Sequence, residues 1–499
     1  MRFQIDTSDR LAIDADFDRA YLGRLEGRVY PTEVRVEGNY LICRREVSES
    51  ARLFVSYAVP GFGRPVLNTA ALREQEEPYV LAVELARGRI GLVRDQLAAW
   101  QQSGMTISDD AVTALQEAQK KLRVAACCEN DGGTPAGAAQ AALIAACQAS
   151  DILVASYVRQ RLAIRRRRSS HLPILLGCPL RAMRPARAGD KAFVSAFTAT
   201  TAAVEWGKVE PSQGEYEWTL QDEQVEFAER NRLVAIAGPL LDFGNRGMPE
   251  WLWQWGRDYY ALQSFVSDFV ETAITRYASR VRTWEIAARA NTGGGLALDE
   301  EHRLALTARA IEVAKQTDDE LQLSLRIDQP AGEYQAAGLH RLSPLQFVDA
   351  LIRSGAGLTC LTLEYAVGYR PCGSDYRDRF ELSRLIDLWS TLGLPLTISL
   401  AFPSQAKSDP NAEAGIEVRE PQWKAPWSEP AQGEWLAEML PLLMSKPSVA
   451  GIEWCCFSDA VAHRFPHSGL TRPDGSSKPA FERLGRFREA YWQRNRDAG

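Results

Sequence analysis

The sequence lacks a long apolar run, and it lacks an excess of positive charge. No stretch reaches the ~18 uninterrupted apolar residues of a membrane-spanning helix, and the N-terminus has no signal-peptide-like apolar segment. The 499 residues carry a net charge of −6 and a sequence pI near 5.7, so no global basic field attracts nucleic acid or anionic lipid. We therefore expect a cytoplasmic protein without a membrane or nucleic-acid partner, whose oligomeric state is open.

The usual signals for metals and cofactors are also missing. Nine cysteines without a repeated spacing argue against a disulfide framework. The adjacent pairs Cys127-Cys128 and Cys455-Cys456 lack the spacing of zinc knuckles. No Gly-x-Gly-x-x-Gly follows the first strand predicted after residue 171, which weighs against a dinucleotide site. We expect buried free thiols, no cofactor and no metal.

Within the first 168 residues the spacing of apolar residues changes once, from the alternation typical of strands to the spacing typical of helices. Residues 33–37 and 52–59 alternate polar and apolar side chains, so residues 1–70 are expected to form a β-sandwich-like module. Apolar residues then recur at helical spacing in 79–100, 109–126 and 135–164, around a turn predicted at 130–133, so residues 71–168 are expected to form a helical segment. Residues 165–171 are expected to be a linker, and Arg165 to Arg168 a surface or helix-end cluster.

Strands and helices alternate strictly from residue 172 to residue 499. The candidate strands are 172–180, 193–204, 233–243, 281–289, 321–329, 358–366, 394–403 and 449–459. Amphipathic stretches lie between them, such as 221–231, 261–277, 300–316 and 380–392. Strict alternation indicates a parallel sheet, and eight strands favour a closed barrel over a doubly wound sheet. The predicted fold class is therefore α/β, a (β/α)₈ TIM barrel preceded by the β-rich module and the helical segment.

Several segments of this barrel resemble family 10 glycoside hydrolases, the xylanase family. Residues 205–218 resemble the family's E-N-x-x-K-W-x-x-x-E-P-x-x-G-x-(Y/F)-x-W segment, and residues 249–252 resemble its P-x-W-(L/F). Residues 284–286 resemble the opening of W-D-V-V-N-E on the fourth strand. Residues 451–459 resemble G-(I/V)-x-x-W-x-x-x-D, and residues 469–481 resemble G-L-L-x-x-D-G-x-x-K-P-A-Y. The resemblance covers the barrel alone and implies a cleft for an oligo- or polysaccharide.

The resemblance fails at the catalytic residues. Members of the family retain configuration with two glutamates, one the acid and base and the other the nucleophile. Arg289 occupies the acid position on the fourth strand. The seventh strand contains no acid, so Ser399 or Leu400 takes the place of the nucleophile. The normal mechanism of the family cannot run with these residues.

Other carboxylates are predicted at the C-terminal ends of the strands, where barrel active sites lie. Glu364 is the sharpest candidate, because it lies beside the lost nucleophile where the family's sixth strand usually carries glutamine. It could act as a relocated nucleophile or base, with Glu453, Asp328 or Asp242 as the partner acid. The favoured alternative is a structural carboxylate that pairs with Arg289 or Arg326.

The remaining candidates would bind a substrate. Arg289 cannot supply a proton, so it either clamps a carboxylate such as that of a uronic acid or, as we favour, balances Glu364. Trp206 and Trp454 offer flat faces for sugar rings, whereas His463 and His467 lack the helical register of a zinc site. The predicted catalytic residues are Glu364 and Glu453. The predicted substrate-binding residues are Glu205, Trp206, Lys208, Asp242, Arg289, Asn291, Arg326, Asp328, Tyr365, Trp454 and Asp459.

Three functions remain open from the sequence. We favour a xylanase-like pseudoenzyme that binds a saccharide and has a degenerate catalytic site. The first alternative is an active glycosidase that uses a relocated carboxylate set around Glu364. The second is a structural or assembly protein, in which the N-terminal module and helices bind a partner and the barrel is a scaffold.

Overall fold

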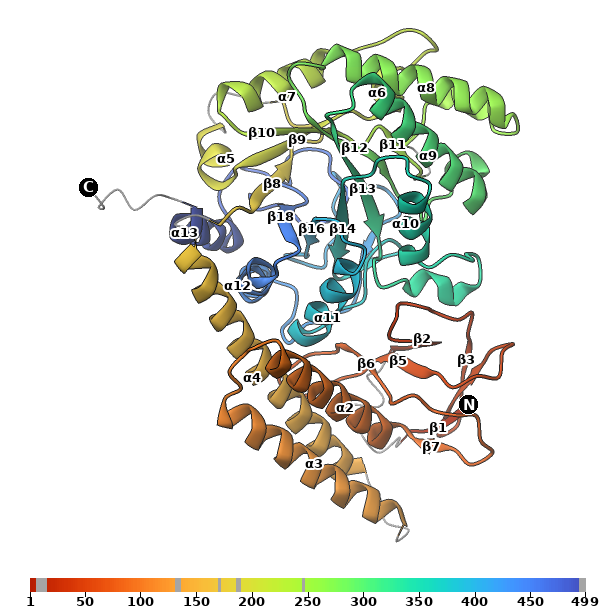
Figure 1. The fold of residues 1–499 in the computed structure, drawn as a ribbon, viewed down its shortest axis with the longest axis vertical. Coiled ribbons are helices and arrows are strands. Elements are labelled where there is room, and N and C mark those ends of the chain that lie inside the picture. The colour runs from red at the N-terminus through yellow and green to blue at the C-terminus, as the bar shows by residue number, and fades with distance from the viewer. Residues whose placement is uncertain (6–15, 131–135, 169–171, 185–189, 245–246, 493–499) are drawn as a thin grey trace, which may run out of the picture.

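The N-terminal part of the chain forms two small sheets beside the barrel (Figure 1). The computed structural model describes residues 1–5, 16–130, 136–168, 172–184, 190–244 and 247–492. One sheet has the order β3 (Glu33–Glu37), β4 (Tyr40–Arg44), β1 (Arg2–Gln4), β7 (Tyr79–Val80), and the other has the order β2 (Asp16–Gly23), β5 (Arg52–Ser56), β6 (Val66–Asn68). A β-rich module is therefore present, and the alternating runs at 33–37 and 52–59 contribute β3 and β5 to it.

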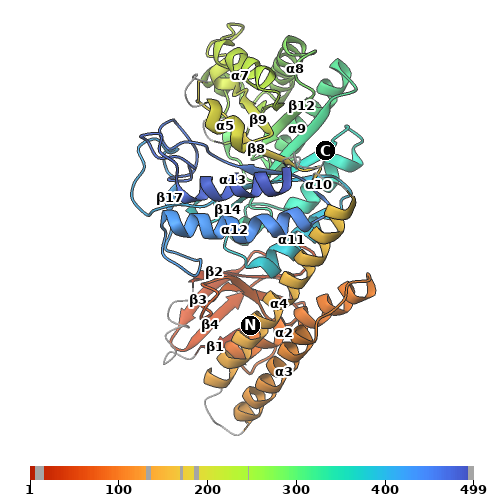
Figure 2. The ribbon, with the colours of Figure 1, turned by 90° about the vertical axis from the view of Figure 1, so that its left-hand side faces the viewer.

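Three long helices follow, α2 (Leu81–Gln102), α3 (Asp109–Asn130) and α4 (Ala136–Arg168). α4 packs on α2 and α3 and extends along the barrel (Figure 2). The linker expected at 165–171 is wrong for its first four residues, because Arg165 to Arg168 form the last turn of α4. Most of the turn expected at 130–133 lies outside the described residues. By length and composition α4 could cross a membrane, but most of its apolar segment is buried inside the protein, as in a core helix.

Eight strand positions close into a parallel barrel. In ring order they are β8 (Leu175–Pro179), β9 (Ala199–Ala203), β10 (Val234–Gly238) with β11 (Leu241–Asp242), β12 (Thr283–Ala288), β13 (Gln322–Asp328), β14 (Cys360–Ala366), β16 (Leu396–Ala401) and β18 (Val449–Trp454). β18 pairs with β8, and β10 pairs with β12, so the ring has no free edge. The predicted (β/α)₈ barrel is confirmed.

One strand boundary is wrong. The predicted strand 193–204 begins too early, because Phe193 lies in α5 (Asp190–Ala196). Phe193 packs on Phe197, four residues later, and on Phe227. That i, i+4 contact is helical, and the strand itself starts at Ala199. The continuous apolar run therefore contained a helix end as well as a strand.

Helices surround the barrel and are fixed by local capping. The remaining barrel helices are α6 (Trp206–Val209), α7 (Thr219–Arg230), α8 (Tyr259–Arg276), α9 (Glu300–Thr317), α10 (Pro344–Arg353), α11 (Arg379–Ser390), α12 (Glu429–Ser445) and α13 (Pro479–Trp492), with short 3₁₀ turns η1 (Glu250–Trp255), η2 (Gly295–Ala297) and η3 (Glu333–Ala337) and a small ribbon of β15 (Tyr369–Arg370) and β17 (Glu417–Val418). Ser343 and Gln346 form a capping box at the start of α10, with Pro344 in the first turn. Asp299 and Asp378 cap α9 and α11.

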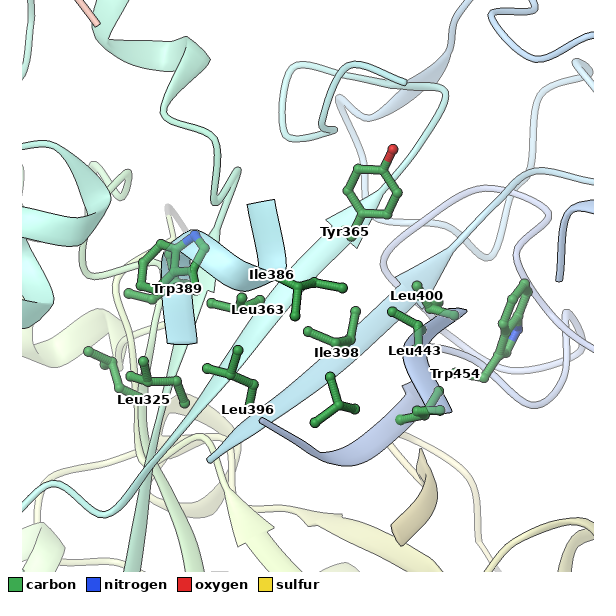
Figure 3. Packing of buried hydrophobic residues seen from close by; sticks show 14 of the residues in the cluster. Leu325, Leu363, Tyr365, Ile386, Trp389, Leu396, Ile398, Leu400, Leu443 and Trp454 are labelled. Atoms are coloured by element: carbon green, nitrogen blue, oxygen red, sulfur yellow. The ribbon is translucent and has the colours of Figure 1, made fainter. Parts of the chain in front are cut away.

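The two faces of the barrel strands differ in chemistry. Leu363 and Tyr365 of β14 lie in a buried apolar layer with Ile398 and Leu400 of β16 and with helix residues such as Trp389 (Figure 3). Successive strand residues point to opposite faces. The alternate residues of the same strands are Thr362, Glu364, Thr397 and Ser399, which are all polar and, apart from the half-buried Thr397, all buried. On these two strands the residues that face the barrel interior are therefore polar, whereas those that face the surrounding helices are apolar.

A second set of buried charges joins the N-terminal module and α2 to the barrel. We call it the interface cluster; it comprises Arg19, Arg89, Glu333, Asp375, Arg377, Asp378, Glu381 and Arg419. Arg89 on α2 is paired with Asp378 and, at 3.1 Å, with Glu381, both at the start of α11. The Oδ1 of Asp375 lies 2.6 Å from the Nη1 of Arg419 and 3.2 Å from the Nε of Arg19. Because these ion pairs are buried, they fix the orientation of the module on the barrel.

Candidate functional site

Four polar residues occupy the same level of the barrel interior. Strand pairing aligns Asp328 with Glu364, Glu364 with Ser399, and Ser399 with Glu453. The Oγ of Ser399 donates a hydrogen bond to Glu453 at 2.7 Å. Leu400 lies instead in the outer apolar layer (Figure 3). Of the two residues considered for the nucleophile position, Ser399 is thus the one that reaches the interior.

Arg326 connects three of the interior carboxylates. Its Nε lies 2.8 Å from Glu285 and its Nη2 lies 2.9 Å from Glu453. Its Nη1 lies 3.6 Å from Glu364. An arginine can serve several carboxylates in this way because its five N–H donors form a rigid planar fork.

Arg464 is the closest partner of Glu364. Its Nη1 lies 2.7 Å from Glu364, and its Nη2 lies 2.9 Å from Asp328. The expectation that Glu364 pairs with Arg289 is therefore wrong, whereas the pairing with Arg326 exists at a longer distance. We call Glu285, Arg326, Asp328, Glu364, Glu453 and Arg464 the barrel cluster. It holds four carboxylates and two arginines.

Arg289, which the sequence resemblance aligns with the family's acid, forms its own ion pair. It binds both carboxylate oxygens of Asp242, with Nε at 2.6 Å from Oδ1, and its Nη1 lies 3.3 Å from Glu413. Its backbone is in the left-handed region, with φ of 58°. Gly244 makes room for this guanidinium, since a Cβ there would lie 2.4 Å from its central carbon. Arg289 is thus held as a fixed cation beside Asp242.

The imbalance of charge in the barrel cluster is reflected in pKa values. Burial raises the pKa of Glu364 to about 7, although Arg464 opposes the shift. Burial also raises the pKa of Glu285 against the effect of Arg326. For Asp242 burial acts in the same direction, but the charge and hydrogen bonds of Arg289 outweigh it and leave the pKa below its ordinary value. Glu364 is therefore the carboxyl group most suited to carry a proton near neutral pH.

A cavity of about 430 Å³ opens over these residues at the C-terminal ends of the strands. Six of the predicted site residues line this cavity, namely Glu205, Lys208, Asp242, Arg289, Arg326 and Glu364. Glu453 and Asp328 lie behind this surface and contact it through Arg326 and Arg464. The structure thus brings together most of the predicted charged residues in one concave site.

The three aromatic residues predicted to contact a substrate lie outside the lining of this cavity. Trp206 is fully buried and stacks on Phe269, with 4.6 Å between ring centroids. Trp454 is buried and donates to the carbonyl of Ser468. The hydroxyl of Tyr365 accepts from the backbone N–H of Arg377 at 2.7 Å. None of the three lines the cavity, because each lies on the outer side of the barrel wall or among the surrounding loops.

Asn291 and Asp459 also have structural contacts in place of a position in the cavity. The buried amide of Asn291 donates to the carbonyl of Asp328 at 2.8 Å and so holds the end of β13. Asp459 is buried, lies 2.5 Å from Lys478 and accepts from the backbone of Gly469. These two predicted substrate contacts are therefore replaced by contacts that shape the loops around the site.

The two histidines of the 462–467 loop hold the loop together. The Nε2 of His463 lies 3.0 Å from Asp409, and its Nδ1 lies 2.7 Å from the carbonyl of Val461. Cys456, Asp459 and His463 are close enough for one ion, but Asp459 is already paired with Lys478. Both ring nitrogens of His463 are occupied as well, so the protein's own groups satisfy these side chains.

The charged cavity residues that the predicted set lacks include Arg181, Glu413 and Arg464. Arg181 follows β8 directly, so its place at the end of a strand was a signal that could have identified it. Glu413 and Arg464 lie in long loops after β16 and β18. No periodicity places a loop side chain, so these two could not be found from pattern alone.

Comparison with known proteins supports the resemblance over part of the chain. The sequence model of Glycosyl hydrolase family 10 matches residues 187–304. Endo-1,4-beta-xylanase B of Thermotoga neapolitana is 26% identical over 94 residues, which are 18% of this chain and 26% of that relative. The chain therefore matches only about a quarter of that xylanase's length. The matched family segment includes Asp242, Glu285 and Arg289 but ends before the strands of Glu364 and Ser399.

Solved xylanase structures are similar to this chain at low identity. Xylanase 10B from Thermotoga maritima has a TM-score of 0.48 and 16% identity, with 64% of this chain and 97% of that chain covered. A GH10 structure from Paenibacillus barcinonensis has a TM-score of 0.49 and 15% identity, with 65% and 97% covered. The barrel assignment above rests on the strand pairing of this chain itself.

Proposed function

We propose that this protein is a family 10-like saccharide-binding barrel whose standard catalytic site is degenerate. The observation that carries the proposal is the pairing of Arg289 with Asp242 in a cavity that otherwise keeps its position over the strand ends. A group that must donate a proton is replaced by a fixed cation, which cannot do so. The cavity itself remains large and polar enough for a sugar unit.

The seventh-strand position supports the same proposal. A retaining glycosidase needs a carboxylate nucleophile about 5–5.5 Å from its acid. Ser399 supplies a hydroxyl there, and this hydroxyl donates to Glu453. A serine without a histidine base beside it is a weak nucleophile. In this proposal both halves of the standard pair are replaced, while a cavity remains over the strand ends.

One observation favours a second function, an active glycosidase with a relocated carboxylate set. Glu364 lines the cavity, and burial raises its pKa to about 7. A carboxyl group with such a pKa suits general acid catalysis near neutral pH. Against this, Arg464 and Arg326 surround Glu364, and the position of Glu453 behind the cavity surface gives it no direct path to a substrate.

The test is a panel of xylan, glucan and uronic-acid oligosaccharides, assayed for thermal stabilisation and for products by mass spectrometry. We expect stabilisation by at least one saccharide without product after long incubation. Product release that is lost in Glu364→Gln and kept in Glu417→Gln would replace our proposal with the second function. Glu417 is a suitable control because it is exposed on β17. If no saccharide stabilises the protein and no product is released, both the binding proposal and the second function are overturned.

A further inference from the structure

We infer that the saccharide carries a carboxylate and that Arg181 receives it. This inference rests on the proposed saccharide-binding function and names the chemical class of the ligand. Arg181 lines the cavity immediately after β8, on the side where β8 meets β18. The sequence analysis gave this role to Arg289 as the less favoured of two alternatives, but Asp242 and Glu413 already engage that side chain.

Arg181 differs from the other cations of the cavity in its contacts. Among the described residues, its guanidinium makes one hydrogen bond, from Nε to the backbone carbonyl of Cys455 at 3.1 Å. Its two Nη nitrogens have no partner in that part of the chain, and they are not sealed from solvent. Bidentate binding of a carboxylate needs two such parallel N–H donors.

The other described cations of the cavity are each paired with an acid. Lys208 lies 2.6 Å from Glu205, and Arg289 is engaged by Asp242. Arg326 and Arg464 hold the carboxylates of the barrel cluster. An incoming anion would have to displace a carboxylate from any of these four. Arg181 can accept an anion without breaking an ion pair.

The loop that carries Arg181 is fixed before a ligand arrives. Gln224 on α7 donates from its side-chain amide to the carbonyls of Arg181 and Met183, at 2.8 and 2.9 Å. The backbone of Leu180 donates to Thr201. Arg181 itself is in the left-handed region, with φ of 49°, a conformation that persists only where the surroundings impose it. A preorganised donor loses less freedom on binding.

The surrounding charge disfavours a doubly charged ligand more than a singly charged one. The barrel cluster already contains more carboxylates than arginines, and Arg181 acts on Glu364 and Glu285 through space. A doubly charged phosphate would be repelled by this excess more strongly than a singly charged carboxylate. A planar carboxylate also matches the fork of the guanidinium. A uronic acid unit satisfies both conditions.

The experiment uses two ligands that differ only in the carboxylate. One is a β-linked oligosaccharide with a single glucuronic acid unit, and the other is the same molecule with that carboxylate reduced to an alcohol. Binding is measured by calorimetry on the full-length protein and on Arg181→Gln. Arg184→Gln is the matched control, because it removes the same charge from an exposed residue of the same loop. Unchanged melting temperatures show that both variants fold.

We expect the wild type to bind the acidic ligand at least about tenfold tighter than the reduced one, since charge-assisted pairs are the strong ones. Arg181→Gln should lose that preference and keep its affinity for the reduced ligand, and Arg184→Gln should behave as the wild type. Equal binding of both ligands by the wild type would overturn the carboxylate site and leave saccharide binding standing. A preference that survives in Arg181→Gln would overturn the assignment to this residue. Binding of neither ligand, nor of any neutral saccharide, would overturn the proposed function as well.

Discussion

The interface cluster and the barrel cluster are both buried networks of arginines and carboxylates, but their balance of charge differs. The interface cluster has four arginines for four carboxylates. The barrel cluster has two arginines for four carboxylates. In the first, burial would raise the pKa of Asp375, but its arginines hold it below the ordinary value. In the second, burial prevails and the pKa of Glu364 is raised.

This difference separates a structural network from one that can respond to its surroundings. In a network with equal numbers of arginines and carboxylates, protonation of a carboxylate relieves no repulsion between like charges. Such a network therefore serves to hold two parts of the protein together. A network with more carboxylates than arginines can take up a proton near neutral pH. In this protein that network also lines a cavity. Perturbed pKa values gather at functional sites for this reason. The comparison therefore supports the proposed ligand site beside the barrel cluster, whereas the interface cluster joins the N-terminal module to the barrel.

The largest expected effect comes from removing one arginine from each cluster. Arg89→Met leaves Asp378 and Glu381 buried without their cation, and we expect a loss of about 3–5 kcal/mol in the free energy of unfolding. Arg464→Met should cost less, about 1–3 kcal/mol near pH 6, because Glu364 can take up a proton. Urea unfolding of both variants would measure the difference.

The control for this pair is Arg341→Met, which removes an arginine that is 89% exposed in its side chain. Its effect should stay within about 0.5 kcal/mol. Equal losses for Arg89→Met and Arg464→Met at every pH would contradict the distinction between the two clusters.

A smaller effect is expected from the titration of Glu364. Its pKa is raised from an ordinary 4.5 to about 7 in the folded state, so the folded state binds more protons than the unfolded state between these values. The stability that protonation contributes is complete below the lower value and is lost as pH rises through the upper one. Glu364→Gln should remove about 3 kcal/mol of this pH dependence. Unfolding midpoints measured across this range test it, and an unchanged slope in the variant would assign the titration elsewhere.

The smallest effect is expected at Ser399. Ser399→Ala removes the hydroxyl that donates to Glu453, and the loss of one hydrogen bond to a buried carboxylate should cost about 1.5 kcal/mol. Chemical denaturation gives the value, with Ser390→Ala on α11 as a control that removes a half-buried hydroxyl outside the cluster. A loss no larger than that of the control would mean that Ser399 contributes nothing to the barrel cluster.

Much of the fold could be predicted because it is set by periodicity. Strict alternation of strands and helices fixed the number of barrel strands, and most predicted strand positions agree with the structure within a few residues. The exceptions have local causes. The helical contact of Phe193 with Phe197 shortens the second strand, and α4 runs on through the arginines where a linker was expected.

The site could be predicted only in part, and the aromatic contacts show why. Trp454 follows Glu453, and Tyr365 follows Glu364, so neighbouring residues of one strand must point to opposite faces. Glu364 faces the cavity and Glu453 lies in the barrel cluster, so the aromatic partners belong to the outer layer. Strand alternation could have excluded both aromatics. Arg464 could not be foreseen, since it reaches Glu364 from a loop 100 residues away in the sequence.

The docking of the N-terminal module has a consequence for the order of events during synthesis. Its buried partners lie far along the chain, as with Arg89 and Asp378, or Arg165 and the carbonyl of Met444. A chain made from its N-terminus therefore exposes the docking face of α2 and α4 until the last third of the barrel has left the ribosome. Until then, Arg89 lacks its carboxylate partners, and the part of α4 that packs on α11 and α12 is uncovered.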